Sequence, residues 1–179
     1  MSQSRAGDLY VVATPIGNLA DMTQRAVDVL RDADIVAAED TRVTARLLSA
    51  YDINGKPVVA CHDHNEDVVA RDIVDRLAQG ASVALVSDAG TPLISDPGYR
   101  VVNAVIEAGL RVIPIPGPSA AMAALSVAGM TTDRFMFCGF LPTKKVARRS
   151  YLSELPFSTM TVVIYEAPHR VMDTLIDLC

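Results

Sequence analysis

The chain has 179 residues, half of them hydrophobic and 21% charged, so it is long enough for one well-packed domain and part of a second. A formal net charge of −5 argues against a surface that is basic overall, although a local basic patch would still allow nucleic-acid binding. No apolar run reaches the roughly 18 residues that a membrane-spanning helix needs.

Short apolar runs of strand length alternate with helical patterns through the first two thirds of the chain. The predicted strands are 9–13, 35–38, 58–61, 83–86 and 112–115. Five helices are predicted. They begin after Asp21 or Thr23, after Arg42, after Asn65 as an N-cap, after Gly98 and after Ser119. In the same order, they end near residues 32, 50, 79, 108 and 128. Alternating strands and helices, with strands that are continuously apolar, are typical of a parallel sheet covered on both faces.

A second pattern begins after a short linker. A strand at 135–138, a basic segment, a strand at 161–165 and a helix from Pro168 follow, and the chain stops within this pattern. The sequence therefore predicts an α/β fold with a parallel-sheet N-terminal domain at 8–130 and an incomplete C-terminal α/β domain at 134–179.

The segment 87–98, which follows the predicted strand at 83–86, is the most distinctive stretch of the chain. It is long for a turn between a strand and a helix, and it combines glycines and prolines with Asp88 and Asp96. Proline fixes φ and glycine allows positive φ, so we expect a stiff, shaped loop. Open α/β sheets bind ligands at the carboxyl ends of their strands, where this loop lies. An ordinary long connection is the alternative interpretation.

Four other turns also follow predicted strands, at 14–19, 39–42, 62–65 and 116–120. In a parallel sheet these turns emerge at one edge, so we expect them to converge with 87–98 on one crevice. The chain contains neither GxGxxG nor GxxxxGK[ST], and the crevice is rich in carboxylates. This composition favours a neutral or cationic ligand over one with several phosphates.

Two of these turns carry candidates for proton transfer. Glu39 and Asp40 could orient a substrate or accept a proton, or Asp40 could simply cap a helix. His62 and His64 could act as bases near neutral pH, or they could be turn residues bonded to the backbone. No cysteine or third histidine lies at ligand spacing, so we expect no metal site.

Two further features bear on partners and compartment. The segment 143–149 carries Lys144, Lys145, Arg148 and Arg149 without a negative charge, and it is either a solvated helix face or a place where a polyanion binds. The three cysteines lie far apart and form no CxxC pair, which is typical of reduced thiols in the cytoplasm.

Seven motifs in this order resemble the ribosomal RNA small subunit methyltransferase I family, within the tetrapyrrole methylase superfamily. They are TPIGNL at 14–19, EDTR at 39–42, HDHNE at 62–66, the loop at 87–98, PGPSA at 116–120, GFLP at 139–142 and YEAPHR at 165–170. The resemblance runs from residue 9 to the end of the chain. It implies a two-domain α/β enzyme that uses S-adenosylmethionine and works as a homodimer. It also implies 2′-O-methylation of a cytidine in the decoding region of small-subunit (16S) ribosomal RNA.

The resemblance implies where the cofactor binds, in a cleft between two domains. Transferred by position, the residues that line it or shape its loop are Ile16, Asp88, Gly90, Thr91, Ile94, Ser119 and Ala120. The cofactor has a sulfonium and no phosphate, which agrees with the missing phosphate cradle. Superfamily relatives carry Gly-Asp-Pro where this chain has Gly90, Thr91 and Pro92, and family members continue roughly a hundred residues further. We therefore expect the 179-residue chain to bind the cofactor weakly or not at all.

We expect a direct in-line transfer in which the ribose 2′-hydroxyl attacks the methyl carbon of the sulfonium. A base or acceptor must take the proton, and the candidates are Glu39, Asp40 and His64. The RNA phosphates are assigned to the basic residues Arg42, Lys144, Lys145, Arg148 and Arg149. Two alternatives stay open: a tetrapyrrole (precorrin-type) methyltransferase, whose substrate carboxylates would pair with 144–149, and a non-catalytic RNA-binding module.

Overall fold

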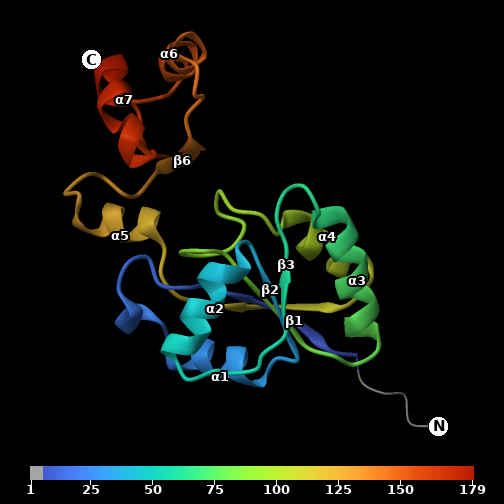
Figure 1. Ribbon diagram of the computed structural model, residues 1–179. Coiled ribbons are helices and arrows are strands. Elements are labelled where there is room, and N and C mark those ends of the chain that lie inside the picture. The colour runs from blue at the N-terminus through green and yellow to red at the C-terminus, as the bar shows by residue number, and fades with distance from the viewer. Residues whose placement is uncertain (1–5) are drawn as a thin grey trace. The chain divides into compact units, whose positions relative to one another are not determined.

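The structure is a computed structural model that describes residues 6–179 (Figure 1). It divides into two compact units, the first ending at Ser119 and the second spanning Ala120–Cys179. The sequence placed the boundary near residue 130. The structure groups helix α5 (Ala120–Val127) with the second unit, where the Ala121 N–H donates to the Tyr165 hydroxyl (3.1 Å). Among the residues described, no helix is both long and apolar enough to cross a membrane.

The first unit is a five-stranded sheet with helices on both faces. Its strands are β1 (Asp8–Val12), β2 (Ile35–Ala38), β3 (Val58–Ala60), β4 (Val83–Val86) and β5 (Arg111–Ile115). Its helices are the short 3-10 turn η1 (Leu19–Asp21), α1 (Gln24–Asp32), α2 (Thr41–Ala50), α3 (Glu66–Ala78) and α4 (Tyr99–Glu107). The sequence predicted all of these elements except η1, with bounds that differ by one or two residues.

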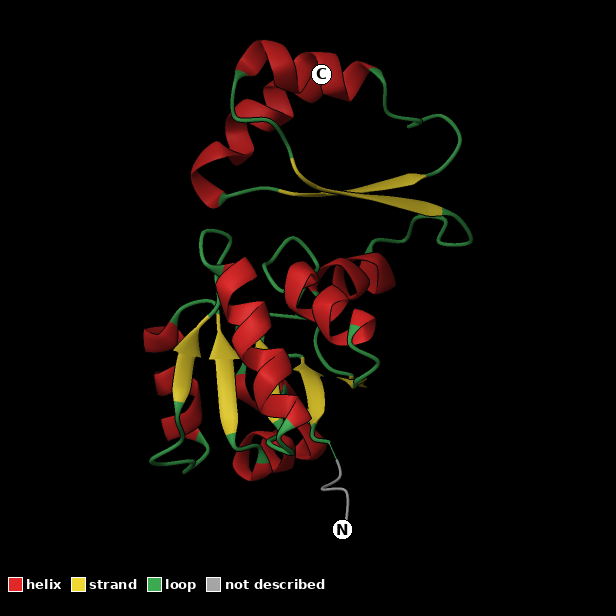
Figure 2. Cartoon of the chain, turned by 90° about the vertical axis from the view of Figure 1, so that its right-hand side faces the viewer, coloured by secondary structure: helices red, strands yellow, loops and turns green. Residues whose placement is uncertain are grey.

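All five strands run parallel, in the order β3-β2-β4-β1-β5. Figure 2 shows strands of this sheet in yellow, with helices packed beside them in red. β4 lies between β1 and β2, with Val83 opposite both Leu9 and Ile35. Every residue of β4 is buried, as expected for a strand covered on both faces. The predicted α/β class and parallel sheet are therefore confirmed.

The strands feed two separate cores because successive side chains point to opposite faces. On one face, Ala84 and Val86 of β4 belong to the core that α1 and α2 cover, with Leu30 as a fully buried member. On the other face, Val83 and Leu85 belong to the core that α3 and α4 cover. Figure 1 shows these two pairs of helices on opposite sides of the sheet.

The starts of α2 and α3 use polar residues in different ways. Asp40 caps α2, one of the two roles that the sequence left open for it, because its carboxylate accepts the Arg42 N–H (2.8 Å). Asn65 occupies the N-cap position of α3 as predicted, but its side chain makes no capping hydrogen bond. The Asn65 amide instead accepts the His62 N–H (2.8 Å) and donates to the Ala60 carbonyl oxygen (2.9 Å), so it stabilises the turn after β3.

In the second unit, β6 (Phe135–Phe140) and β7 (Thr161–Tyr165) pair in parallel, with an irregularity between Phe137 and Phe140. The helices besides α5 are α6 (Lys145–Ser153), the 3-10 turn η2 (Pro168–Arg170) and α7 (Val171–Leu178). The basic segment thus forms most of α6. Large apolar side chains of α7 are exposed, among them Met172 (69%) and Ile176 (58%).

Candidate active site

The turns that follow the strands of the first unit lie at one edge of the sheet, because all five strands are parallel. Two turns are joined by reciprocal backbone hydrogen bonds, from the Thr14 N–H to Gly90 O (2.8 Å) and from the Gly90 N–H to Thr14 O (3.1 Å). The Thr14 hydroxyl donates to Ser87 O (3.1 Å), and the Thr91 hydroxyl donates to Pro118 O (3.0 Å). The turns after β1, β4 and β5 therefore form one connected framework.

The loop 87–98 has a backbone that few residue types adopt. Gly98 has a φ of 124°, and the non-glycine residues Leu93 (71°) and Ser95 (68°) also have left-handed φ values. A Cβ on Gly98 would lie 2.9 Å from Cδ2 of Leu85, so the end of the loop packs directly on β4. This packing holds the loop in the shaped form that its glycines and prolines predict.

A buried carboxylate fixes the end of this loop. Glu66 of α3 is 4% exposed, and its Oε1 accepts the N–H groups of Gly98 (3.0 Å) and Arg100 (2.6 Å). N–H groups at the start of a helix have no partner within it, so Glu66 caps α4 from a neighbouring helix. The sequence contained Glu66 in a motif but did not indicate this contact, because it joins residues far apart in the chain.

Glu39 and Asp88 meet where the turns after β2 and β4 lie side by side. The Asp88 N–H donates to Glu39 Oε2 (3.3 Å), and the Asp40 N–H donates to Asp88 Oδ1 (3.1 Å). Burial raises the pKa of Glu39, and the negative charges of Asp96 and Asp88 raise it further. Burial also raises the pKa values of Asp88 and Asp96. The acidic crevice predicted from the sequence thus contains carboxylates that hold protons more tightly than usual.

Asp40 and Arg42 are engaged with each other. The Arg42 guanidinium donates to the Asp40 carboxylate through Nε (3.0 Å) and Nη2 (2.6 Å). These bonds and the backbone N–H of Arg42 hold the pKa of Asp40 well below its usual range. So acidic a carboxyl is a poor proton acceptor, which favours Glu39 over Asp40 as the base.

His64, the third candidate base, is exposed on the turn after β3. β3 pairs with β2, so this turn neighbours the one that carries Glu39. The His64 ring lies 6.1 Å from that of His62, centroid to centroid. Across residues 6–179, no three histidine, cysteine, aspartate or glutamate side chains are grouped to hold a metal ion.

The residues assigned to the cofactor lie on the strand-end turns of the first unit, except Ala120, which begins the second unit. A Cβ on Gly90 would lie 3.5 Å from Cγ2 of Ile16, so these two turns approach closely. Ile94 is 41% exposed, while Thr91 and Ser119 are half-buried. The structure brings the assigned residues of 16–94 to one edge, next to Glu39 and Asp88.

Helix α6 does not expose all of its predicted RNA-binding residues. Lys144, Lys145 and Arg149 are exposed, but Arg148 is only 4% exposed. The Arg148 guanidinium donates to the Asp177 carboxylate through Nε (2.9 Å) and Nη2 (2.6 Å), and Arg149 donates to the same group (2.7 Å). The assignment of Arg148 to RNA is therefore corrected: its side chain is buried and joins α6 to α7.

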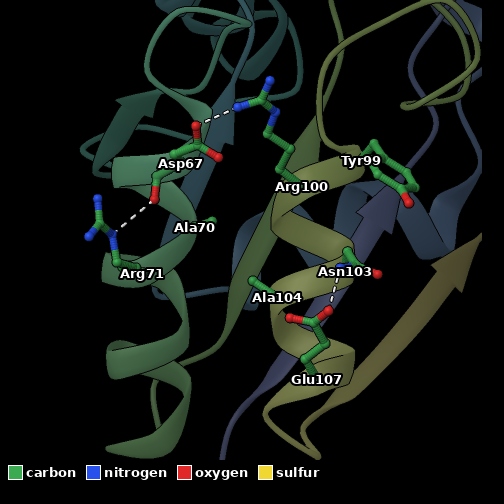
Figure 3. Close-up of a pocket in the computed structure, with 8 residues that line it drawn as sticks. All are labelled: Asp67, Ala70, Arg71, Tyr99, Arg100, Asn103, Ala104 and Glu107. Carbon is green, nitrogen blue, oxygen red and sulfur yellow. Dashed lines mark hydrogen bonds and ion pairs between the residues drawn. The ribbon is translucent and has the colours of Figure 1, made fainter.

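A hollow of about 400 Å³ lies between α3 and α4 (Figure 3). Its charged groups already have partners: Arg100 pairs with Asp67, Arg71 donates to the Asp67 carbonyl oxygen (3.2 Å), and the Asn103 amide donates to Glu107 (2.8 Å). It lies along two helices that cover one face of the sheet. We do not assign the chemistry to it, because its charged side chains already have partners and the acidic crevice lies elsewhere.

A second hollow, of about 340 Å³, lies at the strand-end edge between the turn after β1 and helix α2, and we call it the α2 hollow. It is lined by Pro15, Gly17, Asn18, Leu19, Val43, Arg46, Leu47, Ala50 and Asp88. It shares Asp88 with the acidic crevice. Arg46 was not predicted from the sequence, although its place one helical turn after Arg42 was the signal that could have found it.

The second unit has a hollow of its own, of about 370 Å³, lined by residues of α5, β6 and β7 that include Ala120. The Tyr165 ring packs edge-to-face with Phe137 (4.8 Å) and Phe140 (5.7 Å), centroid to centroid. An aromatic wall of this kind suits a flat ring. The sequence marked the turn after β7 but missed the part of Tyr165 in this wall.

Known proteins resemble this chain over nearly its whole length. It is 52% identical over 172 residues to ribosomal RNA small subunit methyltransferase I of Escherichia coli O157:H7, which covers 96% of this chain and 60% of that protein. It is 53% identical over 175 residues to the protein of the same name from Xylella fastidiosa, covering 98% and 64%. The chain therefore spans less than two thirds of the length of these relatives.

The fold is also that of a solved methyltransferase. The crystal structure of uroporphyrin-III-C-methyltransferase from Thermus thermophilus matches with a TM-score of 0.62 and 19% identity, covering 96% of this chain and 74% of that one. The sequence profile of the Tetrapyrrole (Corrin/Porphyrin) Methylases matches residues 8–179. This chain therefore belongs to the tetrapyrrole methylase family.

Proposed function

We propose that the protein is an S-adenosylmethionine-dependent methyltransferase that modifies the 2′-oxygen of a cytidine in the decoding region of 16S ribosomal RNA. Relatives at 52% and 53% identity bear the name of a ribosomal RNA small subunit methyltransferase. The observation that carries the proposal is the position of Glu39: a carboxylate of raised pKa, half-buried at the edge where five strand-end turns emerge.

The strand-end edge suits a sulfonium cofactor. Glu39, Asp88 and Asp96 supply negative charge, and Arg42, a cation of these turns, is bound to Asp40. When bound, S-adenosylmethionine supplies a methyl group on a positively charged sulfur that leaves as a neutral thioether. The residues proposed to hold it are Ile16, Asp88, Gly90, Thr91, Ile94, Ser119 and Ala120.

In this proposal Glu39 accepts the proton of the ribose 2′-hydroxyl while that oxygen gains the methyl group. The raised pKa makes Glu39 a stronger base than an ordinary glutamate. Asp40 orders the acidic crevice through its N–H bond to Asp88. The remaining acceleration comes from alignment of the two reactants.

The proposed partners are the small ribosomal subunit and a second copy of the protein. Lys144, Lys145 and Arg149 of α6 are exposed and would contact RNA phosphates. A homodimer is the proposed working form, and sedimentation of the full-length protein would measure it.

Transfer of a tritiated methyl group to small ribosomal subunits that lack the modification tests the proposal, with the full-length protein. We expect label in 16S ribosomal RNA, recovered as 2′-O-methylcytidine after nuclease digestion. Label on a tetrapyrrole such as uroporphyrinogen III, with none on RNA, would favour the tetrapyrrole alternative. RNA binding without transfer would favour a non-catalytic module, and either result overturns the proposal.

A further inference from the structure

The α2 hollow has the walls of a site for a flat ring. Pro15 and Leu19 come from the turn after β1, and Val43 and Leu47 stand four residues apart on α2. Leu19 is 51% exposed, so apolar surface is open to a ligand. A volume of about 340 Å³ lies at the lower end of the range for small-ligand pockets.

Arg46 is an uncommitted cation in this hollow. Within residues 6–179 its guanidinium forms no hydrogen bond or ion pair, whereas Arg42, one turn earlier, is held by Asp40. A guanidinium without a partner binds a phosphate through two parallel hydrogen bonds. The hollow between α3 and α4 differs, because Arg71 and Arg100 both have partners there.

Asn18 adds directed hydrogen-bond donors. Its Oδ1 accepts the Ala20 N–H (3.0 Å), which leaves the amide NH₂ group for a ligand. The carbonyl oxygen and the ring-nitrogen acceptor of a cytosine match such donors. At the other end of the hollow, Asp88 donates its N–H to Glu39 Oε2 (3.3 Å), so a ligand there lies next to the proposed base.

We propose that the α2 hollow receives one nucleotide of single-stranded RNA, with its base against Leu19 and Val43 and its phosphate on Arg46. The inference rests on the proposed function, since it names the place where the RNA substrate enters. The nucleotide must be unstacked, because a base stacked in a duplex has no free face to lie against Leu19 and Val43. Arg46, and not Arg42, then becomes the RNA-binding residue of α2.

Binding of a fluorescein-labelled single-stranded RNA to the full-length protein, measured over a range of salt concentrations, tests this inference. Arg46→Ala should raise Kd about tenfold and lower the slope of log K against log salt by about one. Arg46→Lys should restore part of the affinity, because it keeps the charge but not the paired hydrogen bonds. Leu19→Ala should weaken binding several-fold. For methyl transfer, KM should rise while kcat and S-adenosylmethionine affinity stay constant.

Arg71→Ala is the matched control, because Arg71 is also an exposed helical arginine, and it should bind as the wild type does. Wild-type RNA affinity in Arg46→Ala would overturn the inference and leave the proposed function standing. Equal losses in Arg46→Ala and Arg71→Ala would also overturn it. If the wild type transfers no methyl group to RNA while Arg46→Ala alone weakens RNA binding, the proposed function falls and the RNA site stands.

Discussion

Glu39 and Asp40 are neighbours in sequence, yet their surroundings move their pKa values in opposite directions. Burial raises the pKa of Glu39, while hydrogen bonds from Arg42 lower that of Asp40. Groups whose pKa values are pushed apart divide acid–base roles between them. Here the division gives proton acceptance to Glu39 and helix capping to Asp40.

Glu39→Gln removes the acceptor while keeping the shape of the side chain. We expect methyl transfer in a single turnover to fall by about 10² to 10⁴-fold, the usual contribution of a general base. The affinity for S-adenosylmethionine, measured by calorimetry, should change far less, because Asp88 and Asp96 still supply negative charge. Glu107→Gln on α4 is the matched control with full activity. A Glu39→Gln enzyme with normal turnover would assign the proton to another group, with His64 next to be tested.

The pH dependence of kcat/KM should report the environment of Glu39. Protonated Glu39 cannot accept a proton, so activity falls as pH drops through its pKa, above the ordinary value of 4.5. Asp96→Asn removes a negative charge that disfavours ionised Glu39, so it should move this acid limb to lower pH. Asp32 is exposed on α1, so Asp32→Asn serves as the charge control. It should leave the acid limb of the profile where it is in the wild type. If the acid limb of the kcat/KM profile did not move in Asp96→Asn, a group other than Glu39 would be responsible for that limb.

The same raised pKa values affect stability. The folded state binds protons at Glu39, Asp88 and Asp96 more tightly than the unfolded chain does. Their contribution to the free energy of unfolding is therefore complete below the unfolded pKa values and is lost as pH rises through the folded ones. Asp96→Asn should thus gain stability relative to the wild type as pH rises through this window, measured by urea unfolding. If the difference in free energy of unfolding between Asp96→Asn and the wild type did not change with pH, the raised pKa of Asp96 would be contradicted.

At the scale of elements, α3 holds the loop 87–98 and the start of α4 in place through one side chain. Glu66→Ala leaves the N–H groups of Gly98 and Arg100 without their acceptor in a buried position. We expect a loss of about 1–3 kcal/mol and faster hydrogen exchange at these two amides. Glu66→Gln keeps an oxygen and should lose less. Unchanged protection of both amides in Glu66→Ala would show that the loop is held by its packing alone.

The elements themselves were predictable because their signals are local. Apolar runs of four or five residues mark β2 and β4, and Asp40 marks the start of α2. Asn65 stands at the predicted start of α3, but its side chain bonds to the turn before the helix instead of capping it. The local sequence allows an asparagine amide either to cap the following helix or to bond to the preceding turn, and it does not show which of the two occurs.

The candidate site was predictable in place but not in detail. Parallel strands bring their turns to one edge, so the convergence of 14–19 with 87–98 followed from the strand pattern alone. Arg148 is buried against Asp177, whereas Arg46 forms no hydrogen bond or ion pair within residues 6–179. Both facts depend on contacts between residues far apart in the chain, which the local sequence does not show. A charge run cannot show which of its members are paired inside the protein.

At the scale of the whole molecule, the chain spans 60% and 64% of two relatives. In the second unit, α7 exposes Met172, Leu175 and Ile176. We expect the 179-residue chain to bind S-adenosylmethionine about tenfold or more weakly than the full-length protein, a loss of about 1.4 kcal/mol or more. Calorimetric titration of both forms measures the difference. Equal affinities would mean that residues 1–179 contain the complete cofactor site.

The strand order carries a consequence for how the first unit is made. Within residues 6–179, β1 pairs only with β4 and β5, so neither of these partners has been synthesised when β1 leaves the ribosome. β2 and β3 can pair early, but they become part of the same sheet as β1 only when β4 (83–86) has been synthesised and lies between β2 and β1. The sheet therefore cannot be completed until the central strand β4 has been synthesised. Until then the nascent chain exposes strand edges with unpaired backbone groups, to which chaperones or other chains can bind.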